Sequence, residues 1–456
     1  MSVFASGLTA AVSSVAGKAR GRLSTGRRGV LAVFAGTAIG QSLALAAAPL
    51  LSRIYSPHDL GILAIVTALA SALTSLASLR LDMAVPLPES EAEARSLVAT
   101  GLASSLVMAF LGTLVVAFAG APIAELLGGP ELRPWLWFVP PITSAMAAYL
   151  VLNQFAVRHR RYPAIGRRSV LSAASNVTVQ LSTGALGLRP TGLLAGLAVG
   201  QATGAISLAL GVRRAAGSPP DTPWTPGRMC RTLATYRRFP LLLMPAGVLN
   251  SLGLAAPVLL IAAFYGSAVA GWFGLAQRVL ALPVMLIGQA FAQVYQGELA
   301  RDVRTHGGRG RRLFTGSSIT LAAIAAVLCL PLVGFGPQLF EVVFGSRWTP
   351  SGEYARALAL CLAAQLIVSP LQRTLVVFGR YGQKLAWDAS RLALVSGSVA
   401  GAAVLGASPL TTVWILSISL ALCYAAGWLM GRRVVTSSPA RPGEHGQERN
   451  QREEAM

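Results

Sequence analysis

Charged residues are scarce in this chain. Asp, Glu, Lys and Arg make up 12% of the 456 residues, against roughly 25% in a soluble domain. Hydrophobic residues make up 54%, and the mean hydropathy is +0.60. No stretch between the apolar runs is long enough to form a water-soluble domain. The composition therefore excludes a water-soluble globular protein and predicts an all-α integral membrane protein.

Cysteine and histidine are also rare, with four of each. The cysteines show no short spacing, and the histidines fall in expected loops or the C-terminal tail, so we predict no disulfide framework, no metal site and no cofactor. No nucleophile–base pair suggests a catalytic site. No basic region with interleaved aromatic residues suggests a nucleic-acid partner. We therefore expect a protein that is not an enzyme.

Acidic residues are absent from the middle of the apolar runs. All 17 Asp and Glu lie in expected loops, in the tail or at the ends of runs. A carboxylate deep in the membrane is the usual device for relaying protons or neutralising a cationic substrate. Its absence disfavours a proton-coupled antiporter of the buried-acid type.

Apolar runs of membrane-spanning length dominate the rest of the chain. A helix needs about 20 apolar residues to cross ~30 Å of hydrocarbon. Runs of this kind, bounded by charges, Gly and Pro, predict about twelve transmembrane helices. Their expected ranges are 30–52, 59–79, 96–119, 134–153, 168–188, 191–212, 239–264, 270–296, 313–336, 354–378, 386–406 and 409–431.

The net charge of +21 is largely an orientation signal. Lys and Arg accumulate in cytoplasmic loops of membrane proteins. If the loops alternate from a cytoplasmic N-terminus, 31 of the 38 Lys and Arg fall on the cytoplasmic side and four on the other. Both termini are therefore predicted to be cytoplasmic.

The chain divides near its middle at a Pro-rich stretch. Tyr55 precedes Gly61 by six residues, and Tyr265 precedes Gly271 in the same way. Arg161-Tyr162 and Arg380-Tyr381 form a second matching pair. Two related six-helix lobes around a central cavity would explain these pairs, although apolar sequences also align by chance. The predicted parts are a basic cytoplasmic segment (1–29), an N-lobe (30–212), a cytoplasmic interlobe loop (213–238), a C-lobe (239–433) and a disordered cytoplasmic tail (434–456).

Several strings in combination resemble a known family. They include L-S-R-I-Y-S-P-H-D-L-G at 51–61, S-L-R-L-D-M-A-V-P-L-P at 78–88 and L-N-Q-F-A-V-R-H-R-R-Y at 152–162. The others are Y-R-R-F-P-L at 236–241, F-Y-G-S-A-V-A-G-W-F-G-L-A-Q-R-V-L-A-L-P at 264–283 and F-G-S-R-W-T-P-S-G-E-Y-A-R at 344–356. Together they resemble the Wzx-type oligosaccharide flippases of the multidrug/oligosaccharidyl-lipid/polysaccharide exporter superfamily, over about residues 31–433.

This resemblance implies a function and partners. Flippases of this type move polyprenyl-pyrophosphate-linked oligosaccharides across the bacterial cytoplasmic (inner) membrane by alternating access, for surface polysaccharide biosynthesis. The implied partners are that lipid-linked sugar, membrane lipids and a polysaccharide polymerase machinery. The resemblance also implies a basic cavity between the lobes.

Arg278 is the most informative candidate for substrate binding. It is embedded in the predicted eighth span, where an unpaired Arg costs from ~3 to over 10 kcal/mol. Gln289, Gln293 and Gln296 lie within about 60° of it on a helical wheel. This stripe predicts a cavity wall that binds pyrophosphate and sugar hydroxyls. The alternative is a hydrogen-bonded seam between helices.

Five further polar positions complete the candidates. Gln41 and Asn250 are deep in the first and seventh spans, where each could line the cavity or join helices. Arg80, beside Asp82, closes the second span and could meet the anionic head group or simply anchor the topology. Arg53 lies at the other side as a possible release contact. Arg373 is a weaker candidate, because it can reach the membrane surface from its span.

Two other functions compete with flipping. A drug or cation antiporter of the same superfamily would need buried acids, which the sequence lacks. A membrane enzyme such as a polysaccharide polymerase or ligase would need a sizeable loop with catalytic residues on the outer side, and every predicted outer loop is short.

Overall fold

A computed structural model describes residues 25–213, 226–305 and 308–437. These residues form helices joined by short connections, and none of them lies in a strand. The predicted basic segment up to residue 24, the interlobe residues 214–225 and the tail from 438 lie outside the described part. The all-α fold class is confirmed.

The first half of the chain forms six long helices and a short one. They are α2 (Thr25–Ile54), α3 (Pro57–Ala77), α4 (Glu91–Leu126), α5 (Val139–Arg158), α6 (Tyr162–Ala185), α7 (Thr191–Arg213) and the short α8 (Pro226–Thr235). Short 3₁₀ turns lie between α3 and α4 (η1, Leu81–Met83) and between α4 and α5 (η2, Pro130–Phe138).

The second half begins with a π-helical turn, η3 (Phe239–Leu243). It continues through α9 (Met244–Arg304), α10 (Gly310–Phe344), the 3₁₀ turn η4 (Ser346–Trp348), α11 (Thr349–Leu371), α12 (Arg373–Val377), α13 (Tyr381–Val404) and α14 (Pro409–Ser437). Helix α9 is two helices joined at Gly266, whose φ of 84° breaks the helical path. The break falls between the expected spans 239–264 and 270–296.

Nine helices in the described ranges are long and apolar enough to cross a membrane. The 61-residue α9 counts once in that number. Helices α6 and α13 are not among the nine, although each has 24 residues. The protein is therefore a multi-pass membrane protein, while the count of twelve crossings stays a prediction.

Short local signals explain where helices begin. The backbone N–H of Asp59 donates to Ser56 Oγ at 3.2 Å, and the Ser56 N–H donates to Asp59 Oδ2 at 2.8 Å. This capping box, followed by Pro57 at the first position, starts α3. The acid at the predicted start of the second span thus has a structural partner in its own turn.

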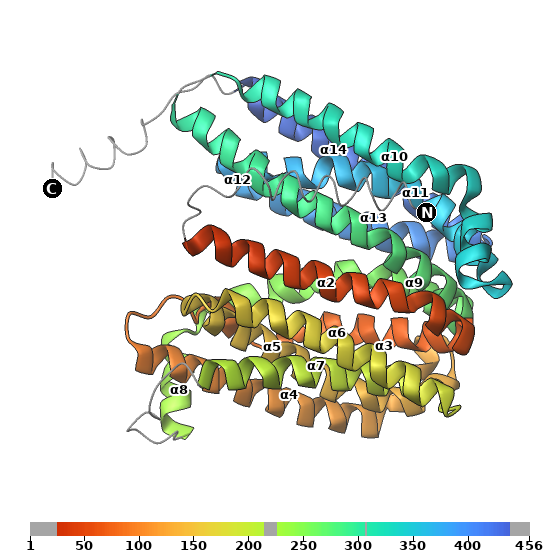
Figure 1. Cartoon of the computed structure of the whole chain (residues 1–456), viewed down its shortest axis with the longest axis horizontal. Coiled ribbons are helices and arrows are strands. Elements are labelled where there is room, and N and C mark those ends of the chain that lie inside the picture. Colours follow the sequence, from red (N-terminus) through yellow and green to blue (C-terminus); the bar gives the residue numbers. More distant parts are fainter. Residues whose placement is uncertain (1–24, 214–225, 306–307, 438–456) are drawn as a thin grey trace.

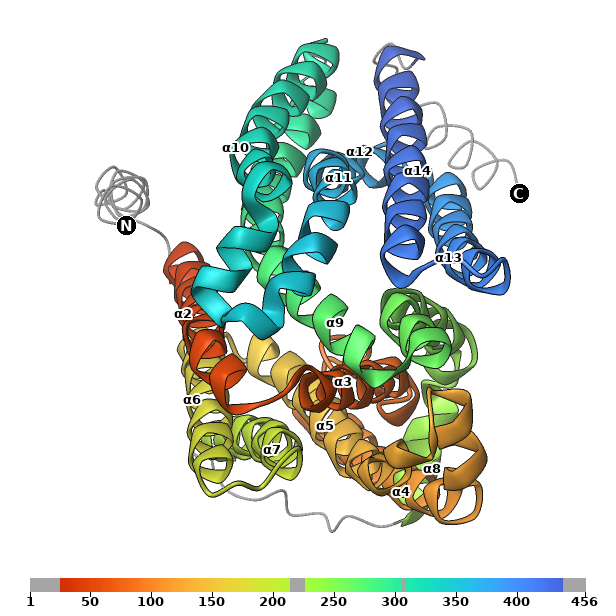
Figure 2. The ribbon, with the colours of Figure 1, turned by 90° about the vertical axis from the view of Figure 1, so that its right-hand side faces the viewer.

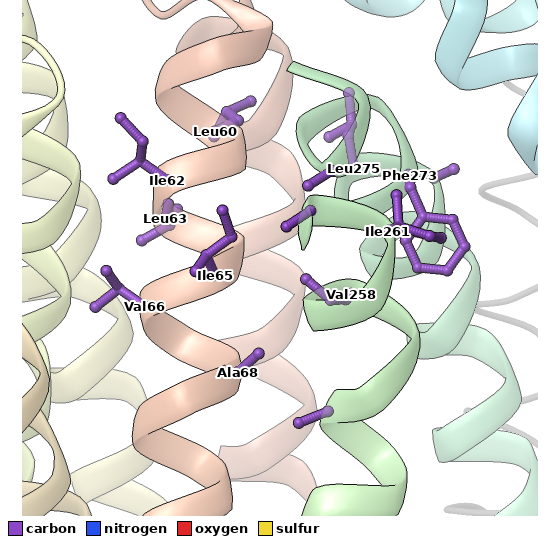
Figure 3. Packing of buried hydrophobic residues seen from close by; sticks show 14 of the residues in the cluster. Leu60, Ile62, Leu63, Ile65, Val66, Ala68, Val258, Ile261, Phe273 and Leu275 are labelled. Carbon is purple, nitrogen blue, oxygen red and sulfur yellow. The ribbon is translucent and has the colours of Figure 1, made fainter. Parts of the chain in front are cut away.

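The two halves of the chain lie on opposite sides of the molecule. Figure 2 shows α2 to α7 in the lower part and α10 to α14 in the upper part, with α9 reaching α3 at the junction. The α3–α9 junction holds much of the apolar core. Figure 3 shows Leu60, Ile65 and Ala68 of α3 beside Val258 and Leu275 of α9. Burial of such side chains contributes ~25 cal/mol per Å² of apolar surface.

Two glycines permit the closest approach at this junction. A Cβ on Gly61 would lie 1.7 Å from Ser267 O, and a Cβ on Gly271 would lie 1.9 Å from Pro57 O. Backbone therefore meets backbone here, and only glycine fits. The two glycines that the sequence paired by their spacing lie against each other.

Tyrosines at equivalent places show that the halves share a design. Tyr55, after α2, donates from its hydroxyl to Gln180 O of α6 at 2.7 Å. Tyr265, at the end of the first part of α9, donates to Ala407 O after α13 at 2.9 Å. Each tyrosine therefore ties the end of the first helix of its half to the fifth.

The second pair of matching motifs, Arg161-Tyr162 and Arg380-Tyr381, also has an equivalent structure in the two halves, at the other end of the molecule. The Arg161 N–H donates to Ala156 O at 2.8 Å, and the Arg380 N–H donates to Leu375 O at 2.7 Å. The preceding residues, Arg160 and Gly379, have φ of 54° and 67°. The helical segments before α6 and before α13 thus end in the same way, with one residue in the left-handed conformation. The end of the molecule that holds Tyr55, between α2 and α3, is called the Tyr55 end below. The opposite end, where α3 stops shortly before Arg80 and where α6 and α13 begin, is called the Arg80 end. They are the right and left ends of Figure 1.

Candidate substrate-binding site

The halves are locked together at the Tyr55 end. Trp348 of η4 is fully buried and donates from Nε1 to Ser52 O at 2.9 Å, while Ser52 Oγ donates to Phe344 O at 3.1 Å. Across the α3–α9 junction, His58 Nδ1 and Ser267 Oγ share a hydrogen bond of 2.6 Å. Polar and apolar contacts from distant parts of the sequence therefore close this end.

The same face of α2 is open farther from this lock. Gln41 precedes Ser52 by eleven residues, or about three helical turns, so both side chains lie on one face. Ser52 is buried against the second half, whereas Gln41 is exposed. The second half therefore covers this face of α2 at Ser52 but does not cover it at Gln41.

A polar pocket of about 410 Å³ lies in the second half, between α9 and the α11–α12 segment. Three predicted residues, Gln289, Gln293 and Gln296, line it. Gln365, Ser369 and Arg373 line it from the other side. The pocket thus gathers four amides, a hydroxyl and a guanidinium, and no Asp or Glu is among the described residues that line it.

Arg278 lies beyond the rim of this pocket. It is on the same face of α9 as the glutamines, three residues before the lining residue Ala281, which is ~4.5 Å along the helix. Its half-buried side chain has no hydrogen bond or ion pair to any residue in the described ranges. The three glutamines therefore line one pocket, whereas their arginine lies one turn closer to the Tyr55 end, and its place in the stripe stays a prediction.

Arg373 takes the place in the pocket that the sequence argument gave to Arg278. Gln365, Ser369 and Arg373 are spaced by four residues, which puts them on one side of their helical segment. Sequence reasoning did not select Gln365 or Ser369. This spacing was the signal that could have found them.

The remaining candidates are not brought to the pocket. Arg53 is exposed in the last turn of α2 at the Tyr55 end. Asn250 is exposed on the first part of α9, and it has no hydrogen bond within the described chain. Their predicted roles in substrate binding stay predictions.

Arg80 and Asp82 lie where the halves meet at the Arg80 end. Arg80 Nη1 is 4.0 Å from Asp82 Oδ2, which is a loose ion pair. The Arg80 guanidinium packs against Gly247 of α9, where a Cβ would be 2.4 Å from Nε. Arg80 is therefore wedged between the halves, and its predicted contact with the substrate stays a prediction.

Burial raises the pKa of the Asp82 carboxyl above its ordinary 3.8, although Arg80 and a hydrogen bond from Ser78 oppose the shift. The folded protein therefore holds this proton more tightly than the unfolded chain. This tighter proton binding stabilises the folded protein fully below pH 3.8, and the stabilisation is lost as the pH rises through the raised pKa of Asp82.

We expect Asp82→Asn to raise the unfolding temperature at neutral pH, because Asn avoids the buried charge. The gain should vanish when both proteins are compared below pH 3.8. Thermal unfolding of the full chain in detergent across this pH range measures it. A variant less stable than the parent at neutral pH would show that the Arg80 ion pair outweighs burial.

An embedded arginine in the first half escaped sequence reasoning. Arg168 stands at the very start of the expected span 168–188 and was not selected as a site residue, but it lies six residues inside α6. Its guanidinium stacks 3.3 Å from the centroid of the Tyr149 ring and donates to Gln201 Oε1 at 3.3 Å. These contacts join α5, α6 and α7, so Arg168 is a packing residue of the first half.

The fold is one that solved membrane transporters share. The lipid II flippase MurJ, in its inward closed conformation, superposes with a TM-score of 0.67 over 88% of this chain and 86% of its own, at 12% identity. An inward-facing multidrug resistance MATE family transporter of the MOP superfamily gives a TM-score of 0.55 over 92% and 96%, at 15% identity. At these identities the likeness shows the fold alone.

The sequence places the chain within a family. A family model described as polysaccharide biosynthesis protein matches residues 50–353, about two thirds of the chain, and the chain belongs to this family. The succinoglycan biosynthesis transport protein ExoT of Rhizobium meliloti (strain 1021) is 24% identical over 84% of this chain and 76% of its own length. The resemblance to Wzx-type flippases is thereby confirmed, and the protein is a membrane transporter of polysaccharide biosynthesis rather than an enzyme.

Proposed function

We propose that this protein flips polyprenyl-pyrophosphate-linked oligosaccharide repeat units across the bacterial cytoplasmic membrane, by alternating access. The observation that carries the proposal is the pocket of four glutamines, Ser369 and Arg373, one turn from Arg278. Among the described residues, no acid lines this pocket and none pairs with Arg278. Amides and hydroxyls pair with sugar hydroxyls, and guanidinium groups pair with phosphate oxygens in a bidentate manner.

The closed Tyr55 end supports a direction of transport. Arginines gather at the Arg80 end, which we assign to the cytoplasm together with both termini. In this orientation the lock at Ser52 and Trp348 faces outward, and Gln41, which the second half does not cover, lies nearer the cytoplasm. The structure then represents the state that receives substrate, and opening of the lock would release it to the outer leaflet and to a polymerase.

A drug or cation antiporter is the competing function, since MATE transporters share the fold. A cationic substrate would need a carboxylate in the pocket, and the described lining has none. Asp59, the acid at the start of α3, is already held in its capping box. The charge of the pocket therefore favours an anionic substrate.

Deletion of the protein in its host tests the function directly. Lipid-linked repeat units should accumulate on the inner leaflet, and surface polysaccharide should fall. Unchanged surface polysaccharide and unchanged lipid intermediates would reject the flippase function. Loss of resistance to cationic drugs without a change in polysaccharide would favour the antiporter.

Arg373→Ala tests the pocket. A charge-assisted hydrogen bond is worth ~1.5–3 kcal/mol, so we expect export to fall by about tenfold or more. Arg301→Ala is the matched control, since Arg301 is exposed on α9 outside the pocket lining. Export is measured as the rate at which lipid-linked repeat units reach the outer leaflet. Equal rates for the two variants would remove Arg373 from the site.

A further inference from the structure

A second cavity lies at the start of α10, outside the transport site. It is a groove of about 710 Å³, lined among others by Arg309, Arg311, Arg312, Thr315, Gly316 and Ile319. We call it the arginine groove. Pockets of ~300–1,000 Å³ hold small ligands, so its size suits a phosphate-bearing head group.

The arginine groove faces away from the protein. The packed side of α10 is formed by Phe314, whose ring lies 5.8 Å from that of Trp428, and by Ser318, which accepts a 3.0 Å hydrogen bond from Trp428 Nε1. Arg312 and Ile319 point to the opposite side of the helix and are exposed. The groove therefore opens to the outside of the protein, and α10 lies along the upper edge of the molecule in Figure 1.

The charges in the groove have no partner among the residues that the structure describes. The side chains of Arg309, Arg311 and Arg312 make no hydrogen bond or ion pair with any residue in the described ranges. The nearby acid, Asp302, accepts a hydrogen bond at 3.2 Å from the backbone N–H of Arg309. No acid is among the described residues that line the groove, so three positive charges surround an open space.

Below the arginines, the same helix presents an apolar surface. Ile319, Val327 and Leu330 are 65%, 64% and 66% exposed, far above the exposure of packed core residues. The α10 surface is thus cationic for its first two turns and apolar from Ile319 onward. This order matches a phospholipid, with a negative head and hydrocarbon chains.

We propose that the arginine groove binds an anionic phospholipid of the leaflet at the Arg80 end, with its phosphate among the three arginines and an acyl chain along Ile319, Val327 and Leu330. Basic pockets at this depth bind anionic head groups, each cation contributing ~1 kcal/mol. The site is separate from the transport pocket, and the proposal holds whether or not the substrate is a lipid-linked sugar.

Titration of the purified full chain in detergent with phosphatidylglycerol, followed by native mass spectrometry, tests the proposal. Arg309→Gln/Arg311→Gln/Arg312→Gln should weaken binding by about a hundredfold, at about fivefold per arginine. The control Arg160→Gln/Arg161→Gln/Arg167→Gln removes three exposed arginines near the start of α6, at the same end of the molecule, and should bind like the parent. Phosphatidylcholine should bind neither variant nor parent at this site.

A second variant tests whether lipid binding needs the open space of the groove as well as its positive charge. A Cβ on Gly316 would meet no atom within 4 Å, so Gly316→Trp should fill the groove without disturbing the fold and should block phosphatidylglycerol while keeping all three arginines. Unchanged binding by Gly316→Trp, or equal losses in the two triple variants, would overturn the proposal. Displacement of phosphatidylglycerol by inorganic phosphate alone would overturn it too, by assigning the groove to a soluble anion.

Discussion

Gly61→Ala should force the two halves apart at the Tyr55 end. The new Cβ would fall 1.7 Å from Ser267 O, and Gly271 offers no room because its own Cβ position lies 1.9 Å from Pro57 O. Backbone atoms on both sides must move, so the cost should reach or exceed the ~1–3 kcal/mol of ordinary overpacking. The hydrogen bond between His58 and Ser267 should break with this movement.

Thermal unfolding and hydrogen exchange of the full chain measure this effect. The unfolding temperature should fall, and exchange should rise in residues 51–61, where the lock at Ser52 and Trp348 loosens. Gly397→Ala in α13 is the matched control, because a Cβ there meets nothing within 4 Å and Ala favours a helix over Gly by ~1 kcal/mol. A Gly61→Ala protein with unchanged unfolding and exchange would show that the close approach does not hold the halves.

The proposed alternating access extends this prediction to transport. A protein that cannot close at the Tyr55 end should leave the receiving state, so export by Gly61→Ala should be strongly reduced. Gly271→Ala acts on the same contact, so the two substitutions together should cost less than the sum of each alone.

The sequence predicted those parts of the fold that depend on local patterns. Apolar runs of bilayer length predicted the helices, since in lipid the backbone must satisfy its own hydrogen bonds. Tyr55 and Tyr265, with Gly61 and Gly271, predicted two related halves, and the structure shows both tyrosines in equivalent hydrogen bonds. Such features carry their signal in residue spacing alone.

The candidate site was predicted only in part, because spacing cannot tell where a helix face meets its neighbour. The wheel put Arg278 and the glutamines on one face, and the three glutamines do line one pocket. The second wall of the pocket, however, comes from α11 and α12, about 80 residues later in the chain. The position of that wall decides that Arg373 lines the pocket and Arg278 does not. Likewise, the sequence put Arg168 at the edge of a predicted span, and only the Tyr149 ring and the Gln201 amide beside it explain why it can lie within α6.

Arg278→Ala should abolish export while leaving the protein at least as stable as the parent. An arginine that served as a seam between helices would have partners, and its loss would destabilise the fold. Arg278 has none among the described residues, and an unpaired cation in the membrane is itself destabilising. Opposite effects on stability and export therefore distinguish a ligand-binding arginine from a structural one.

Arg278→Lys should restore export only partly, because an ammonium is a single point charge and cannot form the two parallel hydrogen bonds of a guanidinium to a phosphate. Gln277→Ala is the matched control, since Gln277 is half-buried one position away and lies off the polar stripe. Export is measured by delivery of lipid-linked repeat units to the outer leaflet, and stability by thermal unfolding. Parent-level export by Arg278→Ala would exclude substrate binding, and a lowered unfolding temperature would return Arg278 to the packing of α9. If export is lost at full stability, the unpaired charge is retained for its ligand, and the pocket continues one helical turn past Ala281 toward the closed end.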